Sequence, residues 1–200
     1  MEDYNTISTN SEIEIEFFLK RLEKSCNFLE FGSGASTLMA LSNGSLSIVS
    51  IDSSQEYIDY LVDEFKILEL PLEKVFFLFV DIGLTGSWGR PIDDLSRDKY
   101  PNYSKLPFEV LKSRDFTPDL ILIDGRFRVA TFLNTLRNCP DSTIIFDDYF
   151  DRPQYFEVER ILKPSDRCGR IAIFQTPHKV GINLLKEIDE MIQKYLYNPD

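Results

Sequence analysis

Short apolar segments that alternate with helical patterns constrain the fold of this chain more than any other feature. The segments are residues 27–32, 45–52, 74–80, 120–124 and 143–147. Strands that are apolar throughout, rather than at every second position, are typical of a parallel sheet covered by helices on both faces. The sequence therefore predicts an α/β fold with a doubly wound, mostly parallel sheet, in one domain over residues 1–200.

Most of the segments between these predicted strands show the spacing of apolar residues that is typical of helices. Thr9, Asn10 and Ser11 are candidate N-caps for a first helix that runs to about Ser25. Further helices are predicted over residues 36–41, 54–68, 129–138 and 185–196, and a shorter one over 155–162 packs on the sheet. Residues 170–174 and 180–184 are predicted as two late strands in an antiparallel end, which brings the sheet to about seven strands.

Composition excludes several classes of protein. No apolar run approaches the roughly 20 residues that a membrane helix needs. The net charge of -11 repels phosphate backbones, so nucleic acid is not expected as a partner. Cys26, Cys139 and Cys168 lack metal-ligand spacing and are expected to be inert thiols. The acidic start, Met1 to Tyr4, is unlike a signal peptide, so a cytoplasmic protein is expected. The oligomeric state is not indicated.

Residues 83–106 form a much longer connection than the others predicted in this chain. This stretch has little periodicity and contains three glycines and two prolines. A connection of this length in a compact domain is usually functional or disordered, and the aromatic residues Trp88, Tyr100 and Tyr103 argue against disorder. We expect an inserted lid or a wall of a substrate site.

A glycine turn after the first strand gives the strongest functional signal. It reads Glu30-Phe31-Gly32-Ser33-Gly34-Ala35-Ser36-Thr37 and leads into a helix. Glycines let the backbone approach a ligand closely, and a helix N-terminus offers free N–H groups. Asp52 follows 20 residues after Gly32 at the end of the second strand, where a carboxylate can accept hydrogen bonds from a ribose diol.

A nicotinamide dinucleotide site has similar spacing and stays open as an alternative. Thr37 occupies the third glycine position of that motif, which argues against a nicotinamide dinucleotide site. Glu30 is placed to meet a cationic amine better than a pyrophosphate.

The order of elements and the motif from Glu30 to Gly34 resemble class I S-adenosylmethionine-dependent methyltransferases over roughly Cys26 to Leu185. The resemblance implies that the glycine turn holds the methionine part, Asp52 the ribose, and Asp81 and Ile82 the adenine. The residues it implies for cofactor binding are Glu30, Gly32, Ser33, Gly34, Ser36, Thr37, Asp52, Ser53, Asp81, Ile82 and Asp124.

Carboxylates also end the fourth and fifth strands. Asp124, Asp147 and Asp148 should converge, because ligands of open parallel sheets bind at the carboxyl ends of the strands. Sugar and small-molecule O-methyltransferases that use magnesium resemble this arrangement, so these three residues are candidate Mg²⁺ ligands. A metal-free role is preferred, with Asp124 or Asp147 as the catalytic proton acceptor.

Arg126 and Arg128 follow Asp124 directly and would repel a metal ion. They are candidates for gripping an anionic acceptor, or for pairing with the nearby aspartates. Trp88, Arg90 and Tyr149 complete the expected substrate-binding set. The motif from Asp124 to Arg128, with Trp88-Gly89-Arg90-Pro91 and the stretch from Asp147 to Pro153, resembles a little-described methyltransferase-like subgroup.

The sequence thus predicts methyl transfer to an oxygen, or a nitrogen, of a small polar acceptor such as a sugar derivative. Two other classes stay open. One is a non-catalytic methyltransferase-like domain that binds a cofactor or a partner protein, and the other is a nicotinamide-dependent oxidoreductase.

Overall fold

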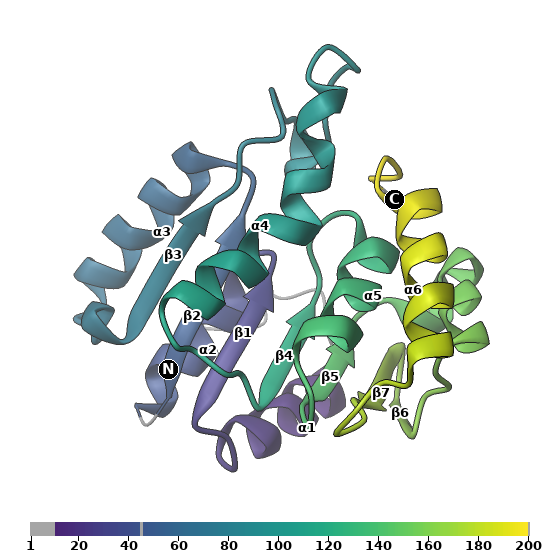
Figure 1. The fold of residues 1–200 in the computed structure, drawn as a ribbon. Coiled ribbons are helices and arrows are strands. Elements are labelled where there is room, and N and C mark those ends of the chain that lie inside the picture. The colour runs from purple at the N-terminus through teal and green to yellow at the C-terminus, as the bar shows by residue number, and fades with distance from the viewer. Residues whose placement is uncertain (1–10, 45, 200) are drawn as a thin grey trace.

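A mixed sheet with helices on both faces forms the centre of the protein. The computed structural model describes residues 11–44 and 46–199, so the capping candidates Thr9 and Asn10 and the strand residue Ser45 lie outside the described residues. Within the described chain, the sheet has seven strands in the order β3-β2-β1-β4-β5-β7-β6 (Figure 1). The doubly wound, mostly parallel sheet predicted from the sequence is confirmed.

The elements have the following bounds. The strands are β1 Asn27–Phe31, β2 Ser47–Asp52, β3 Val75–Phe79, β4 Leu120–Ile123, β5 Thr143–Phe146, β6 Asp166–Cys168 and β7 Ile171–Gln175. The α-helices are α1 Glu12–Leu22, α2 Ala35–Asn43, α3 Gln55–Ile67, α4 Tyr100–Ser113, α5 Arg128–Asn138 and α6 Ile182–Tyr195. Short 3₁₀ helices are η2 Leu72–Lys74, η3 Ser87–Gly89, η4 Arg97–Lys99, η5 Tyr149–Asp151 and η6 Pro153–Arg160.

The register of the sheet brings its functional ends together. β1 runs parallel to both β2 and β4, and Phe31 pairs with Ile51 on one side and with Ile123 on the other. β5 is parallel to β4, with Phe146 beside Ile123. The residues that follow these four strands therefore meet at one edge, the carboxyl edge.

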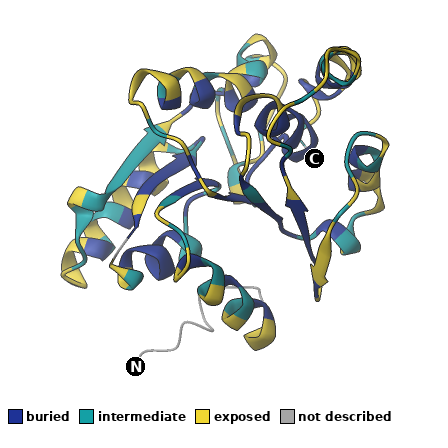
Figure 2. Ribbon diagram, turned by 60° about the horizontal axis from the view of Figure 1, so that its bottom comes forward, coloured by how far each residue is buried: buried dark blue, intermediate teal, exposed yellow. Residues whose placement is uncertain are grey.

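Both faces of the central strands are buried, which explains why these strands are apolar at every position (Figure 2). On one face, Leu29 and Ile121 pack with Phe132 of α5 and Ile192 of α6. On the other face lies a second core with α1, α2 and α3, to which β1 contributes Phe28. Among the described residues, no helix is long and apolar enough to cross a membrane.

The antiparallel end of the sheet differs from the prediction. Residues 180–184 do not form a strand, because α6 begins at Ile182. Val180, Ile182 and Leu184 alternate as in a strand, but the buried residues Ile188, Met191, Ile192 and Tyr195 continue the segment at helical spacing. The antiparallel end consists of β6 and β7. β6 has only three residues, two of them charged and exposed, so no apolar pattern marked it.

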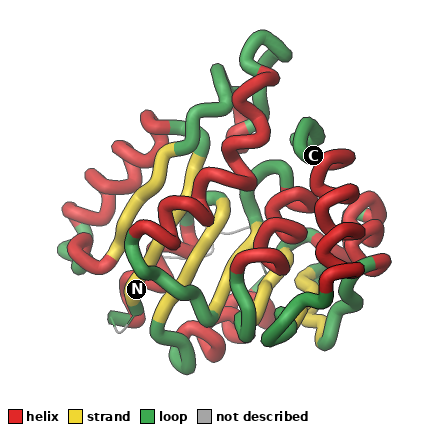
Figure 3. Tube along the Cα trace, in the orientation of Figure 1, coloured by secondary structure: helices red, strands yellow, loops and turns green. Residues whose placement is uncertain are grey.

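The expected irregular segment, residues 83–106, is irregular only up to the start of α4 (Figure 3). Pro101 lies in the first turn of α4, where its missing N–H costs little. Tyr100 and Tyr103, expected in a lid, are buried residues of this helix. The shorter prediction over 155–162 is a 3₁₀ helix, η6, whose Tyr155 and Val158 belong to the core.

We expect Phe132→Ala to lower the free energy of unfolding by roughly 3–5 kcal/mol, the usual cost of removing a buried aromatic ring. Phe132 is fully buried, and its ring centroid lies 4.6 Å from that of Phe174. Phe79→Ala is the control, because Phe79 is 38% exposed on the edge strand β3. Chemical denaturation measures both variants, and equal losses would contradict this account of the core.

Candidate functional site

The glycine turn connects β1 to α2 by passing directly over the loop that follows β4. Gly32 has a φ of 98°, and a Cβ atom placed there would lie 2.9 Å from the backbone of Gly125. Gly125 is confined in turn, since a Cβ there would lie 2.0 Å from the Tyr103 hydroxyl. A side chain at either position would therefore push apart the two loops that carry the site.

Glu30 lies behind this turn. It is fully buried, and its carboxylate accepts hydrogen bonds from the hydroxyls of Ser36, at 2.5 Å, and Thr37. The Thr37 hydroxyl also accepts from the backbone N–H of Gly34 at 2.9 Å. Burial raises the pKa of Glu30 to about 7. Glu30 and Thr37 therefore shape the turn from inside.

Asp52 ends β2 and faces the space in front of the turn. Its two carboxylate oxygens accept from the backbone N–H groups of Ser33, at 3.2 Å, and Ser54, at 2.9 Å. Burial raises the pKa of Asp52, while these backbone hydrogen bonds and the charge of Arg126 act in the opposite direction. The carboxylate is thus fixed at the rim of the turn.

A cavity of about 690 Å³ opens at the carboxyl edge of the sheet. Most of the residues singled out in the sequence line it: Gly32, Ser33, Gly34, Ser36, Asp52, Ser53, Trp88, Arg90, Asp124, Arg126, Arg128, Asp147 and Asp148. The structure thus brings together residues from five separate segments of the chain.

Five of the expected site residues lie off the cavity wall. They are Glu30, Thr37, Asp81, Ile82 and Tyr149. Asp81 is exposed and pairs with Lys99 at 2.6 Å, Ile82 is fully buried, and the buried Tyr149 contacts Glu159 at 3.1 Å.

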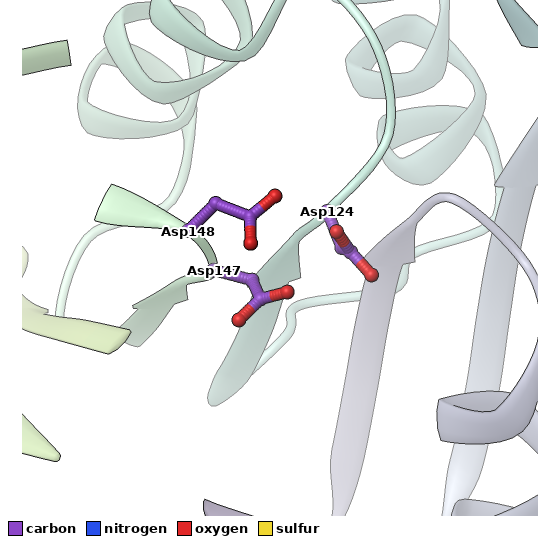
Figure 4. A group of neighbouring side chains, drawn as sticks. All are labelled: Asp124, Asp147 and Asp148. Carbon is purple, nitrogen blue, oxygen red and sulfur yellow. The ribbon is translucent and has the colours of Figure 1, made fainter. Parts of the chain in front are cut away.

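Three aspartates converge at the ends of β4 and β5 (Figure 4). One carboxylate oxygen from each of Asp124, Asp147 and Asp148 lies within 4.8 Å of the others. Asp147 is buried, whereas the Asp124 side chain is 43% exposed. Burial, and then the charges of Asp124 and Asp148, raise the pKa of Asp147 to about 7.

Three arginines neutralise this cluster. Arg128 contacts Asp124 at 2.8 Å and Asp148 at 3.3 Å. Arg152 contacts Asp148 at 2.7 Å, and Arg170 contacts both Asp147 and Asp148 at 3.3 Å. The Arg128 guanidinium is thus held by carboxylates, as the pairing alternative for this residue predicted.

The spacing of the three aspartates suits Mg²⁺, but their charge does not. Every carboxylate already contacts at least one guanidinium, and three permanent positive charges balance three negative ones. A divalent ion would have to displace these contacts while being repelled by the arginines. The residues therefore do not fit a metal ion.

Several cavity residues were not singled out in the sequence. Arg170 lies between β6 and β7, and Arg152 follows η5. Only Arg152 lies close in the sequence to the end of β5, which could have identified it. Tyr57 on α3 also lines the cavity. His178, the only histidine in the sequence, is exposed and lies beside Asp141. Of the expected inert thiols, Cys139 and Cys168 are buried and Cys26 is exposed.

Comparison with solved structures finds proteins of the same fold. A methyltransferase-like protein from Silicibacter pomeroyi is 30% identical, with a TM-score of 0.83 over 96% of this chain and 97% of that one. A methyltransferase from Geobacter sulfurreducens is 11% identical, with a TM-score of 0.54 over 85% and 82% of the two chains. A cofactor-bound protein from MTB is 14% identical, with a TM-score of 0.57 over 86% and 83%. No protein-family model and no curated sequence matches the chain.

We expect the buried carboxyl of Glu30 to make stability depend on pH. Its pKa is about 7 in the folded protein against 4.5 in the unfolded chain, so between these values only the unfolded state releases the proton. The stabilising contribution is complete below pH 4.5 and is lost as the pH rises to 7, on the order of 3 kcal/mol.

Glu30→Gln removes this titration, so its unfolding free energy should change less between pH 4.5 and 7 than that of the wild type. Denaturant unfolding at several pH values measures the difference. Glu187→Gln, at an exposed position of α6, is the control and should follow the wild type. Identical pH profiles for the wild type and Glu30→Gln would contradict the assignment.

Proposed function

The chain belongs to the methyltransferase-like family of the class I fold, and from this we propose that it transfers a methyl group from S-adenosylmethionine to an oxygen or nitrogen of a small polar acceptor. One observation carries the proposal. The glycine turn, the carboxylate of Asp52 and the aspartates after β4 and β5 all line one cavity. Each part matches a need of the reaction: a place for the cofactor, a partner for its ribose and an acceptor for a proton.

The cofactor half of the cavity lies between the glycine turn and the end of β2. Asp52 would accept hydrogen bonds from the ribose hydroxyls, and Gly32 and Gly34 would let the ligand approach the backbone. The volume of about 690 Å³ lies within the range of roughly 300–1,000 Å³ that small-ligand sites occupy. The rest of the lining, which includes Trp88, Arg90, Asp147 and Arg170, would border the acceptor.

When bound, the cofactor supplies an electrophilic methyl group on a sulfonium. Asp147 would take the proton that the acceptor hydroxyl loses as the methyl group is transferred. Its pKa of about 7 suits this role, because a general base works best when its pKa is near the working pH. Asp124 is the second candidate for this role, since it is more exposed and lies at the same edge.

The acceptor that we propose first is a sugar derivative or another small hydroxylated molecule. The mixed wall of arginines and aspartates supports a polar acceptor, since both kinds of side chain can bind hydroxyl groups. Residues 83–99, the irregular part of the expected lid, would form one wall of this acceptor site, because Gly86, Trp88, Gly89 and Arg90 line the cavity.

We expect the wild type to bind S-adenosylhomocysteine in calorimetry and to bind NAD and NADP far more weakly. Asp52→Ala should weaken binding by roughly 1.5–3 kcal/mol, the range for hydrogen bonds to a charged group. Gly34→Val should prevent binding, because its side chain would enter the cavity that Gly34 lines.

Asp59→Ala is the matched control, because Asp59 is exposed on α3 and does not line the cavity. Its affinity for S-adenosylhomocysteine should equal that of the wild type. Absence of binding by the wild type at millimolar ligand, or tighter binding of NAD, would contradict the proposed function.

A further inference from the structure

Residues 84–92 form a small hairpin on the wall of the cavity, named here the Trp88 hairpin. Thr85 and Pro91 form an antiparallel bridge, and the N–H of Gly86 donates to the carbonyl of Arg90 at 2.7 Å. The N–H of Ile92 donates to the carbonyl of Leu84 at 3.1 Å. These hydrogen bonds fix the backbone of the segment, and so they fix where its side chains lie relative to the cavity.

The tip of the hairpin rests against the end of β2. Gly89 has a φ of 67°, and a Cβ atom there would lie 3.0 Å from the Ser53 hydroxyl. Trp88 and Arg90, on either side of Gly89, both line the cavity. The contact at Gly89 therefore sets how far these two side chains reach over the site.

Trp88 adopts a conformation that large side chains rarely take. Its φ is 63° and its ψ is 27°, in the left-handed region, which costs free energy for a residue with a bulky side chain. It is also 80% exposed, and within the described chain its indole packs against no other aromatic ring. Little packing within the protein offsets the strain, so the conformation points to a contact with a ligand.

The charges on the cavity wall are not balanced. Five arginines line the cavity, Arg90, Arg126, Arg128, Arg152 and Arg170, against four carboxylates, Asp52, Asp124, Asp147 and Asp148. Arg128, Arg152 and Arg170 contact the three clustered aspartates, and Arg126 acts on Asp52 by its charge. Arg90 remains, and among the described residues it forms no ion pair.

This surplus of positive charge on the cavity wall contrasts with the net negative charge of the whole chain. The chain has 33 acidic and 22 basic residues, so its overall field repels anions. A wall with one extra positive charge reverses that effect locally. A guanidinium with no carboxylate partner in the described chain can make a two-pronged contact with an incoming carboxylate or phosphate.

We propose that the Trp88 hairpin recognises the acceptor, and that the acceptor is a ring compound with a carboxylate or phosphate group. Arg90 binds the acidic group and Trp88 covers the face of the ring. The inference rests on the proposed function for its reading of the cavity as a methyl-transfer site. It assigns to Arg90 the anion contact that the sequence had suggested for Arg126 and Arg128.

The protein has a single tryptophan, so its intrinsic fluorescence reports on this hairpin directly. The probes are benzoate and phenyl phosphate, each compared with neutral benzyl alcohol, on the ligand-free protein and at saturating S-adenosylhomocysteine. We expect the two acids to change Trp88 fluorescence at about tenfold lower concentration than the alcohol, as a charge-assisted hydrogen bond predicts.

Arg90→Gln keeps the fluorophore and should abolish the preference for the acids. Arg160→Gln is the control, because Arg160 is an exposed arginine outside the cavity, and it should retain the preference. Trp88→Phe should leave the calorimetric affinity for S-adenosylhomocysteine within about twofold, because the proposal places the indole against the acceptor and not against the cofactor.

Three results would overturn the inference: equal responses to acid and alcohol, a preference that persists in Arg90→Gln, or a tenfold loss of S-adenosylhomocysteine affinity in Trp88→Phe. The last result would show that Trp88 covers the cofactor. Failure of the wild type to bind S-adenosylhomocysteine would instead contradict the proposed function, while the preference for acids can still be measured on the ligand-free protein.

Discussion

The buried guanidinium of Arg128 joins the two loops that form the centre of the site. It donates to the backbone carbonyls of Asp124, at 2.7 Å, and Asp147, at 2.9 Å, and it also contacts the carboxylates of Asp124 and Asp148. Arg128 thus adds a side-chain link between the loops after β4 and β5 to the pairing of the two strands themselves. Removing one partner from such a buried network leaves a charge without compensation, which is strongly destabilising.

The ion pairs around the three aspartates also determine which chemistry these carboxylates can support. Arg128, Arg152 and Arg170 together neutralise three aspartates that lie side by side. Burial and the neighbouring carboxylates still raise the pKa of Asp147, so this residue can exchange a proton near neutral pH. The carboxylates alone suggest a metal site, but their contacts with the three arginines make the cluster a network of ion pairs.

The sequence predicted the central sheet well, because strands buried on both faces leave an apolar pattern that no other element shares. The glycine turn and Asp52 were also identified correctly as neighbours, since parallel strands bring their carboxyl ends together. β6 could not be found in this way, because three mostly exposed residues at a sheet edge bury too little to leave a pattern. The strand predicted over 180–184 was wrong because apolar residues at alternate positions also fit one turn of α6.

The functional site, like the sheet, was predicted only in part from the sequence. Arg170, which precedes β7, and Tyr57 of α3 reach the cavity through tertiary packing, and nothing in their local sequence distinguishes them from surface residues. Glu30 was singled out for its place before the glycines, yet the hydroxyls of Ser36 and Thr37 turn it inward. Spacing thus identified the segments that form the site, whereas side-chain direction depended on packing.

A crystal structure with S-adenosylhomocysteine tests the central claim most directly. The account predicts that the ligand lies in the cavity, with its ribose hydroxyls within hydrogen-bonding distance of Asp52 and its sulfur directed toward Asp147. It also predicts that the contacts of Arg128 with Asp124 and Asp148 persist in the complex. A ligand bound elsewhere, or a ribose remote from Asp52, would contradict the account.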